Sequence, residues 1–195
     1  MEVPEVQLRQ LLDKQPTQAV RVVAPPIRSV LPAPKSMPEK LSEHLIAGLL
    51  AAPEHMAYVL DTIDGDMLDP AWQPLYKLLV VDYTENHATN GDRWRTDTFS
   101  ERLADEPNAT QLAESYDTAL FRAEQDFLSL DSAEMRTDIY TTAKRLKKNS
   151  LQKKVNELER QIREAEQAVP RNTQQLDELV RTFQQVSGDL HRLDA

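Results

Sequence analysis

The chain has 195 residues, no cysteine and a formal net charge of −9, and 40% of its residues are hydrophobic. Without cysteine it forms neither disulfides nor thiolate metal sites, and a reducing cytoplasm is the expected compartment. No run of about 18 apolar residues is present, so neither a membrane-spanning helix nor a membrane partner is expected. Glycine is scarce, with 4 residues, and leucine, alanine, glutamate and glutamine are common, which favours an all-α fold.

Residues 1–35 are predicted to form a proline-rich interdomain linker. Between residues 16 and 38, six prolines occur in 23 residues, without a glycine and without an apolar period. This composition is typical of a semi-extended segment that has no core of its own. Because the linker lies so close to the first residue, we expect the chain to be a piece of a longer protein.

Residues 36–149 are predicted to form a bundle of short amphipathic helices. Ser36 and Glu39 form a capping-box pattern at the start of the first helix, and Pro53 is expected to end it. Apolar side chains recur at helical spacing through the bundle and are expected to form its core. They are Leu41, Leu45, Ile46, Leu49, Leu50, Met56, Val59, Leu60, Ile63, Trp72, Leu75, Tyr76, Leu78, Leu79, Phe99, Leu103, Leu112, Tyr116, Leu120 and Phe121.

Polar and proline residues mark further helix boundaries in the bundle. Asp69 followed by Pro70 is expected to begin a helix, and a polar loop is expected at 86–91. Asn108 is expected to cap the helix that follows. Asp131 or Ser132 is expected to cap the last helix, which then runs without proline or glycine to Pro170 over about 55 Å.

Residues 150–195 are predicted to form an antiparallel helical hairpin at the end of this long helix. Apolar residues follow one another at alternating spacings of three and four on both sides of Pro170, as in the seam of a coiled coil. The first seam comprises Leu151, Val155, Leu158, Ile162, Ala165 and Val169, and the second comprises Leu176, Val180, Phe183, Val186, Leu190 and Leu193.

No residue pattern indicates catalysis, a metal or a cofactor. The aspartates between Asp61 and Asp69 do not follow the spacing of a calcium loop, and the four histidines have no metal-ligand partner at helical spacing. No nucleophile–base pair or phosphate-binding glycine loop is present. Trp72 is expected in the core. The segment 93–95 (Arg-Trp-Arg) is a candidate for an exposed partner-contact loop.

Charge divides along the chain. Residues 39–135 carry 20 acidic and 6 basic side chains, whereas residues 136–163 carry 3 acidic and 9 basic ones. The acidic bundle argues against tight nucleic-acid binding, which needs positive contacts with phosphate. The basic run contains Lys144, Arg145, Lys147, Lys148, Lys153 and Lys154. This run is a solvated helix face, a contact for an acidic protein, or a contact for nucleic acid.

The order of these parts resembles the C-terminal helicase-binding domain of bacterial DNA primases of the DnaG type. The resemblance lies in LSEHLIAGLLAAPEH at 41–55 and LDPAWQPLYKLLV at 68–80. It continues in the long helix from 143 to 169 and in QLDELVRTFQQVSGDLHRL at 175–193. It implies a module that binds the N-terminal region of the hexameric replicative DNA helicase, recruits primase to the fork and modulates helicase activity. It also implies that this region is not an enzyme.

In the resembling family, docking is associated with the hairpin. We therefore predict a partner-binding set that combines apolar residues of the second hairpin helix with nearby basic ones. Two alternatives stay open: the N-terminal domain of the replicative helicase itself, and an unrelated coiled-coil adaptor. The predicted set is Leu179, Phe183, Leu190, His191, Leu193, Arg181, Lys147 and Lys148.

Overall fold

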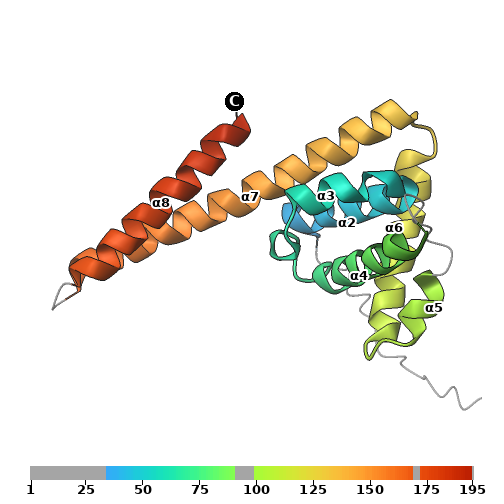
Figure 1. The fold of residues 1–195 in the computed structure, drawn as a ribbon, viewed down its shortest axis with the longest axis horizontal. Helices are drawn as coiled ribbons and strands as arrows, with labels where there is room; N and C mark the ends of the chain where they lie inside the picture. The colour runs from blue at the N-terminus through green and yellow to red at the C-terminus, as the bar shows by residue number, and fades with distance from the viewer. Residues whose placement is uncertain (1–33, 91–98, 169–171, 195) are drawn as a thin grey trace, which may run out of the picture. The chain divides into compact units, whose positions relative to one another are not determined.

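The computed structural model describes residues 34–90, 99–168 and 172–194, and every secondary-structure element in these ranges is helical (Figure 1). The all-α prediction is confirmed. None of these helices is long and apolar enough to cross a membrane. The α-helices are α2 (Met37–Ala51), α3 (Met56–Thr62), α4 (Gln73–Asn90), α5 (Phe99–Ala104), α6 (Ala109–Phe127), α7 (Ser132–Gln167) and α8 (Thr173–Asp194), and the 3-10 helices are η1 (Pro53–His55) and η2 (Gly65–Met67).

Three predicted features fall outside the described residues, wholly or in part. The proline-rich linker lies there up to residue 33, and so does the whole of the candidate contact loop at 93–95. The same holds for Pro170, which was predicted to end the long helix. The structure does describe the end of α7 at Gln167.

Capping boxes begin both α2 and α7. In α2, the backbone N–H of Glu39 donates to the Ser36 hydroxyl at 3.2 Å, and the Glu39 carboxylate accepts from the Ser36 N–H at 3.3 Å. Asp131 and Glu134 repeat this exchange at the start of α7, with distances of 2.8 and 3.0 Å. Asn108 occupies the N-cap position of α6 as predicted, but its side chain makes no capping hydrogen bond.

The predicted boundaries of α4 are wrong at both ends. The helix begins at Gln73, and Asp69 lies in the turn before it, where its carboxylate accepts from the Ala71 N–H at 3.1 Å and its own N–H donates to the buried Ser42 hydroxyl at 2.9 Å. At the other end the helix continues to Asn90 through the predicted polar loop. Asn86 donates there to the Asp82 carboxylate one turn earlier, so polar residues lie on a helix that no proline or glycine interrupts.

The bundle core gathers side chains from α2 through the first half of α7. Most predicted core residues lie in it, including Trp72, which is 4% exposed. Phe121 does not, because it is 61% exposed on α6. It follows Leu112 by nine residues, or two and a half helical turns, and so lies on the opposite side of the helix. The buried face of α6 comprises Leu112, Tyr116, Ala119, Ala123 and Phe127.

Helix α2 packs most tightly against its neighbours at Gly48. A Cβ atom added there would lie 2.8 Å from Cγ1 of Ile139 on α7 and 3.0 Å from Cζ of Phe127 on α6. Gly188 on α8 differs, because a Cβ atom added there meets nothing within 4 Å. The close approach of α2, α6 and α7 therefore depends on the absence of a side chain at Gly48.

These two glycines should respond oppositely to alanine. In Gly48→Ala the overpacking outweighs the gain in helix propensity, and we expect the free energy of unfolding to fall by about 1 kcal/mol or more. In Gly188→Ala only the propensity gain remains, so helix α8 should become more stable by about 0.5–1 kcal/mol. Urea titration followed by far-ultraviolet circular dichroism measures both. Equal stability of Gly48→Ala and the parent would contradict the tight packing.

A buried carboxylate joins α2 to α6. The Glu43 side chain is 7% exposed and pairs with Arg122 on α6 at 3.2 Å and with Lys35 at 2.6 Å. Arg122 also pairs with Asp126 at 2.8 Å. Burial by itself would lower the pKa of Arg122, but its hydrogen bonds to Glu43 and Asp126 raise that pKa above the ordinary value. The guanidinium therefore stays charged and compensates the buried carboxylate.

The same network reaches α7 through His44. Its Nδ1 lies 3.2 Å from the Asp126 carboxylate and its Nε2 lies 2.5 Å from the Asp138 carboxylate. The ring also packs against Phe127, with centroids 5.0 Å apart. His44 thus links three helices.

Loss of the Arg122 guanidinium should destabilise the bundle. In Arg122→Met, Glu43 keeps only Lys35 as a cationic partner, and we expect the free energy of unfolding to fall by about 2 kcal/mol. Arg160 is a matched control, because it also pairs with two carboxylates but lies fully in solvent. Thermal melts should show a lower midpoint for Arg122→Met and an unchanged midpoint for Arg160→Met. A parent-like melt of Arg122→Met would show that the network contributes nothing.

Candidate partner-binding surface

Helix α7 uses two different faces along its length (Figure 1). In its first half Ile139, Ala143 and Leu146 are buried in the bundle core, and in its second half Val155 and Leu158 form a separate cluster with α8. Val155 follows Leu146 by nine residues, or two and a half turns. Helix α8 therefore packs against the side of α7 that faces away from the bundle contact.

The contact between α7 and α8 is an antiparallel apolar seam. Val155, Leu158 and Val186 are its buried residues, and partly buried hydrophobic side chains pack around them. One position of the predicted seam is wrong: Val180 is 36% exposed, and Leu179 packs in its place. At about 100° per residue, 179, 183, 186 and 190 share one helical face, and 180 lies at the margin of that face, beside 176 and 183. The surrounding side chains are Leu151, Leu179, Phe183 and Leu190.

The structure divides the predicted partner-binding residues into two groups. Three of them, Leu179, Phe183 and Leu190, are half-buried in the seam instead of lying on the outer flank of α8. Among the others, His191 and Lys148 are exposed, and the described helices bring them to the same region. Leu151 and Leu190 pack against the same cluster. Because α7 and α8 are antiparallel, the last turn of α8 lies beside the turn of α7 that precedes Leu151, and that turn contains Lys147 and Lys148. The remaining predicted residues are Arg181, exposed, and Leu193 and Lys147, half-buried.

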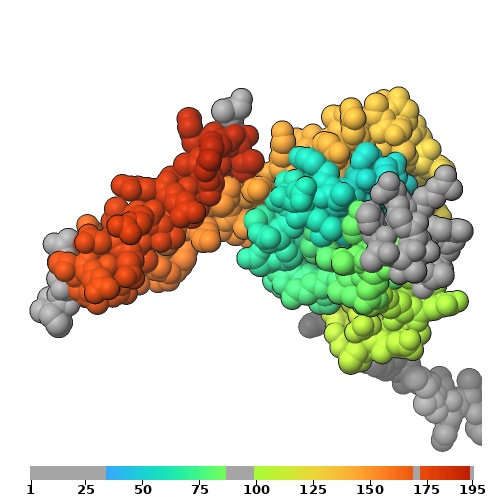
Figure 2. Space-filling view, in the orientation of Figure 1, coloured from blue at the N-terminus to red at the C-terminus, as the bar shows by residue number. Residues whose placement is uncertain are grey.

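The two flanks of α8 differ in character. One flank is uncharged along most of its length and lies at spacings of four, three, four and four; we call it the α8 docking stripe. The other carries charged and amide side chains, and we call it the α8 polar stripe. The docking stripe comprises Leu176, Val180, Phe183, Ser187 and His191, and the polar stripe comprises Glu178, Thr182, Gln185, Asp189 and Arg192. Figure 2 shows α8 in red lying along α7, with much of its surface open to solvent.

Charged groups on the hairpin pair mostly within their own helix. Arg160 contacts Glu157 at 2.5 Å and Glu164 at 2.6 Å, and Arg192 contacts Asp189. Hydrogen bonds from Arg160 and then Gln161 lower the pKa of Glu157, and the bond to Glu157 raises the pKa of Arg160. These exposed pairs stabilise each helix locally, and none of them involves a residue of the docking stripe.

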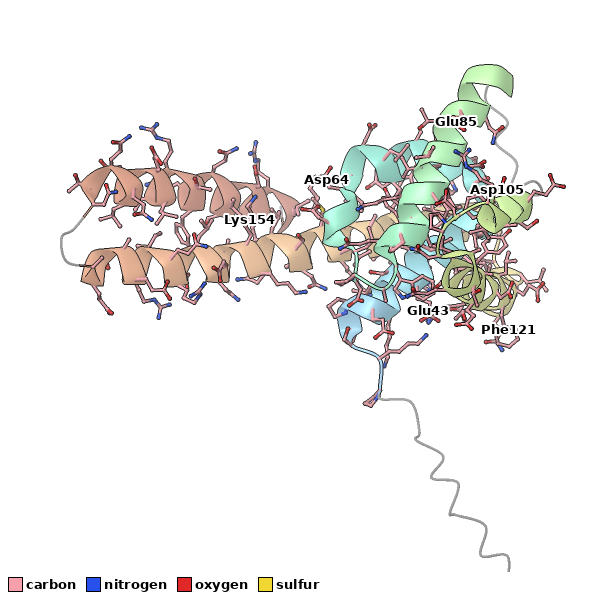
Figure 3. The ribbon with its side chains drawn as sticks, turned by 90° about the horizontal axis from the view of Figure 1, so that it is seen from below. Glu43, Asp64, Glu85, Asp105, Phe121 and Lys154 are labelled. Atoms are coloured by element: carbon pink, nitrogen blue, oxygen red, sulfur yellow. The ribbon has the colours of Figure 1, made fainter. Side chains whose placement is uncertain are left out.

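The basic run of α7 lies where the helix leaves the bundle. Lys144, Arg145, Lys153 and Lys154 are exposed, and none of them forms an ion pair with a described residue. Figure 3 labels Lys154 on the hairpin half of this helix. Such uncompensated cations favour an acidic partner, and they remain compatible with a solvated helix face.

Within the described ranges no group of three or more histidine, aspartate or glutamate side chains is arranged to hold a metal ion. A surface groove of about 770 Å³ lies between α3 and α4. Tyr76 lines it and donates from its hydroxyl to the Ile63 carbonyl at 3.3 Å. Burial and the nearby Asp64 raise the pKa of Tyr76 to about 12, so this phenol stays protonated and structural.

Comparison with known proteins adds no relative: no family model, curated protein or solved structure matches this chain.

The separate hairpin cluster predicts that the hairpin opens without unfolding the bundle. In Val186→Asp a carboxylate replaces a side chain that is 5% exposed, and its desolvation should unpack α8 from α7. In a Trp94→Phe background, which leaves Trp72 in the bundle core as the one emitting tryptophan, we expect a loss of helical circular dichroism with unchanged tryptophan emission. Gln185→Asp, one residue earlier and exposed, is the control and should match the parent. Coupled loss of both signals would show that bundle and hairpin fold as one unit.

Proposed function

We propose that this chain is a non-catalytic interaction module that docks on the N-terminal region of a hexameric replicative DNA helicase. In this role it recruits primase to the replication fork and modulates helicase activity. The sequence resemblance to the helicase-binding domain of bacterial primases supplies the partner. The observation that carries the proposal is the incompletely covered apolar surface of α8.

In a two-helix hairpin, each helix covers the apolar residues of the other from one side only. Here Phe183 and Leu190 stay half-buried although they belong to the cluster, and Val180 beside them is 36% exposed. A partner helix laid along the docking stripe would remove these side chains from water, as amphipathic helices do in recognition grooves. This burial would stabilise both the complex and the hairpin.

The charge distribution supports a protein partner over nucleic acid. The bundle carries an excess of acidic side chains, which opposes the approach of phosphate. The exposed lysines at the base of the hairpin are on the same helix as the seam, and they can pair with carboxylates on a docked protein. We accordingly expect weak binding to single-stranded DNA at physiological salt.

Carboxylates on the docking stripe should abolish docking. In the double variant Val180→Asp with His191→Asp, each new charge would be buried against the partner, and we expect affinity for the full helicase hexamer to fall about 30-fold or more. Thr182→Asp with Gln185→Asp adds the same charge on the polar stripe and should bind nearly as the parent. Isothermal titration calorimetry measures both, and circular dichroism checks that helicity is retained.

Several outcomes separate the proposal from its alternatives. Parent-like binding by the docking-stripe variant would move the contact elsewhere on the molecule. No helicase binding by the parent, together with self-association through α8, would favour the coiled-coil adaptor. Tight DNA binding without helicase binding would remove the primase interpretation altogether.

A further inference from the structure

Helix α6 and its C-cap residue, Leu128, present a second exposed apolar stripe, on the bundle and outside the docking surface proposed above. Phe121 is 61% exposed and Leu128 is 83% exposed, and they are seven residues apart, or almost two full turns. Both side chains therefore face the same way. Figure 3 labels Phe121 at the edge of the bundle. Single exposed hydrophobic residues are ordinary, but two large ones aligned on one helix face mark an interaction surface.

This stripe borders an apolar groove. The groove has a volume of about 360 Å³ and lies between the end of α2 and the last turns of α6. Leu128 lines it together with Leu50, Leu120 and Met135. The exposed side chains thus continue into a recess that can accept apolar side chains from a partner.

Unpaired carboxylates accompany the exposed apolar residues. Asp117 and Glu124 alternate with Phe121 and Leu128 at spacings of four, three and four, and both are exposed. Neither forms an ion pair with a described residue, and Glu124 also lines the groove. The opposite side of α6 differs, because Asp126 there is paired with Arg122. The negative charge on this face is therefore not compensated within the described part of the chain.

We propose that this surface, defined by Asp117, Phe121, Glu124 and Leu128 with the adjoining groove, binds a basic amphipathic helix of a partner protein. Apolar side chains of such a helix would pack on Phe121 and enter the groove beside Leu128. Its lysine or arginine side chains would pair with Asp117 and Glu124. The acidic face repels nucleic acid and anionic lipid surfaces, so a cationic protein segment is the complementary ligand.

The probe is a synthetic helical peptide of about 18 residues with leucines at successive i, i+3 and i+7 positions and lysines on both flanks. Fluorescence anisotropy should show binding to the full chain that weakens as salt rises. Phe121→Ser with Leu128→Ser should weaken binding about tenfold or more, because the apolar anchors are lost. Asp117→Asn with Glu124→Gln should weaken it and remove most of its salt dependence.

Matched controls lie on other faces of the bundle. Val81→Ser removes an apolar side chain that is 43% exposed on α4, and Glu101→Gln with Asp105→Asn removes two exposed carboxylates of the α5 region. These controls should bind the peptide as the parent does, and all α6 variants should keep parent-like thermal melts and helicase binding. Equal loss in the controls would reduce the effect to general charge attraction and overturn the proposal. Sedimentation showing a parent dimer that Phe121→Ser dissociates would also overturn it, since a second copy would then cover this face.

Discussion

The continuity of α7 is the constraint on which the rest of the structure depends. One helix from Ser132 to Gln167 provides a wall of the bundle core and one half of the hairpin. Because Val155 and Leu158 follow Leu146 by nine and twelve residues, about 180° and 120° round the helix, the two contacts lie on different sides of it. Helix α8 consequently packs where no bundle helix covers it, and its outer flank stays in solvent. The docking stripe of α8 is exposed because the apolar residues of α7 that contact the bundle and those that contact α8 lie on different sides of α7.

Charges in the bundle and in the hairpin have different consequences. Inside the bundle, the buried carboxylates are compensated across helices: Glu43 of α2 pairs with Arg122 of α6, and Asp82 of α4 pairs with Arg102 of α5. On the hairpin, pairs such as Arg160 with Glu157 run along one exposed helix and contribute little to tertiary structure. Two groups of exposed charges form no ion pair with a described residue: Lys144, Arg145, Lys153 and Lys154 on α7, and Asp117 and Glu124 on α6. The two groups have opposite charge, and under the proposals above they would bind different partners.

Local signals made much of the fold predictable from sequence. Capping boxes at Ser36 and Asp131 give the starts of α2 and α7 because the pairing involves residues only three positions apart. Apolar periodicity gives the core positions because burial follows the helical repeat. Boundaries set by longer-range contacts were harder. Asp69 has the sequence of a helix start, yet its N–H bonds to Ser42, 27 residues earlier, and the residue stays in a turn.

By itself, the sequence determined that the chain is helical, that a capping box begins at Ser36 and which residues form most of the bundle core, since these depend on neighbours three or four positions away. Only the tertiary structure decided which of two adjacent apolar residues enters a seam, because Leu179 and Val180 fit a helical repeat almost equally well until a partner helix fixes the face. The exposure of Phe121 and the close packing at Gly48 were decided in the same way. Both depend on the positions of neighbouring helices, and the residue pattern of a single helix does not specify those positions.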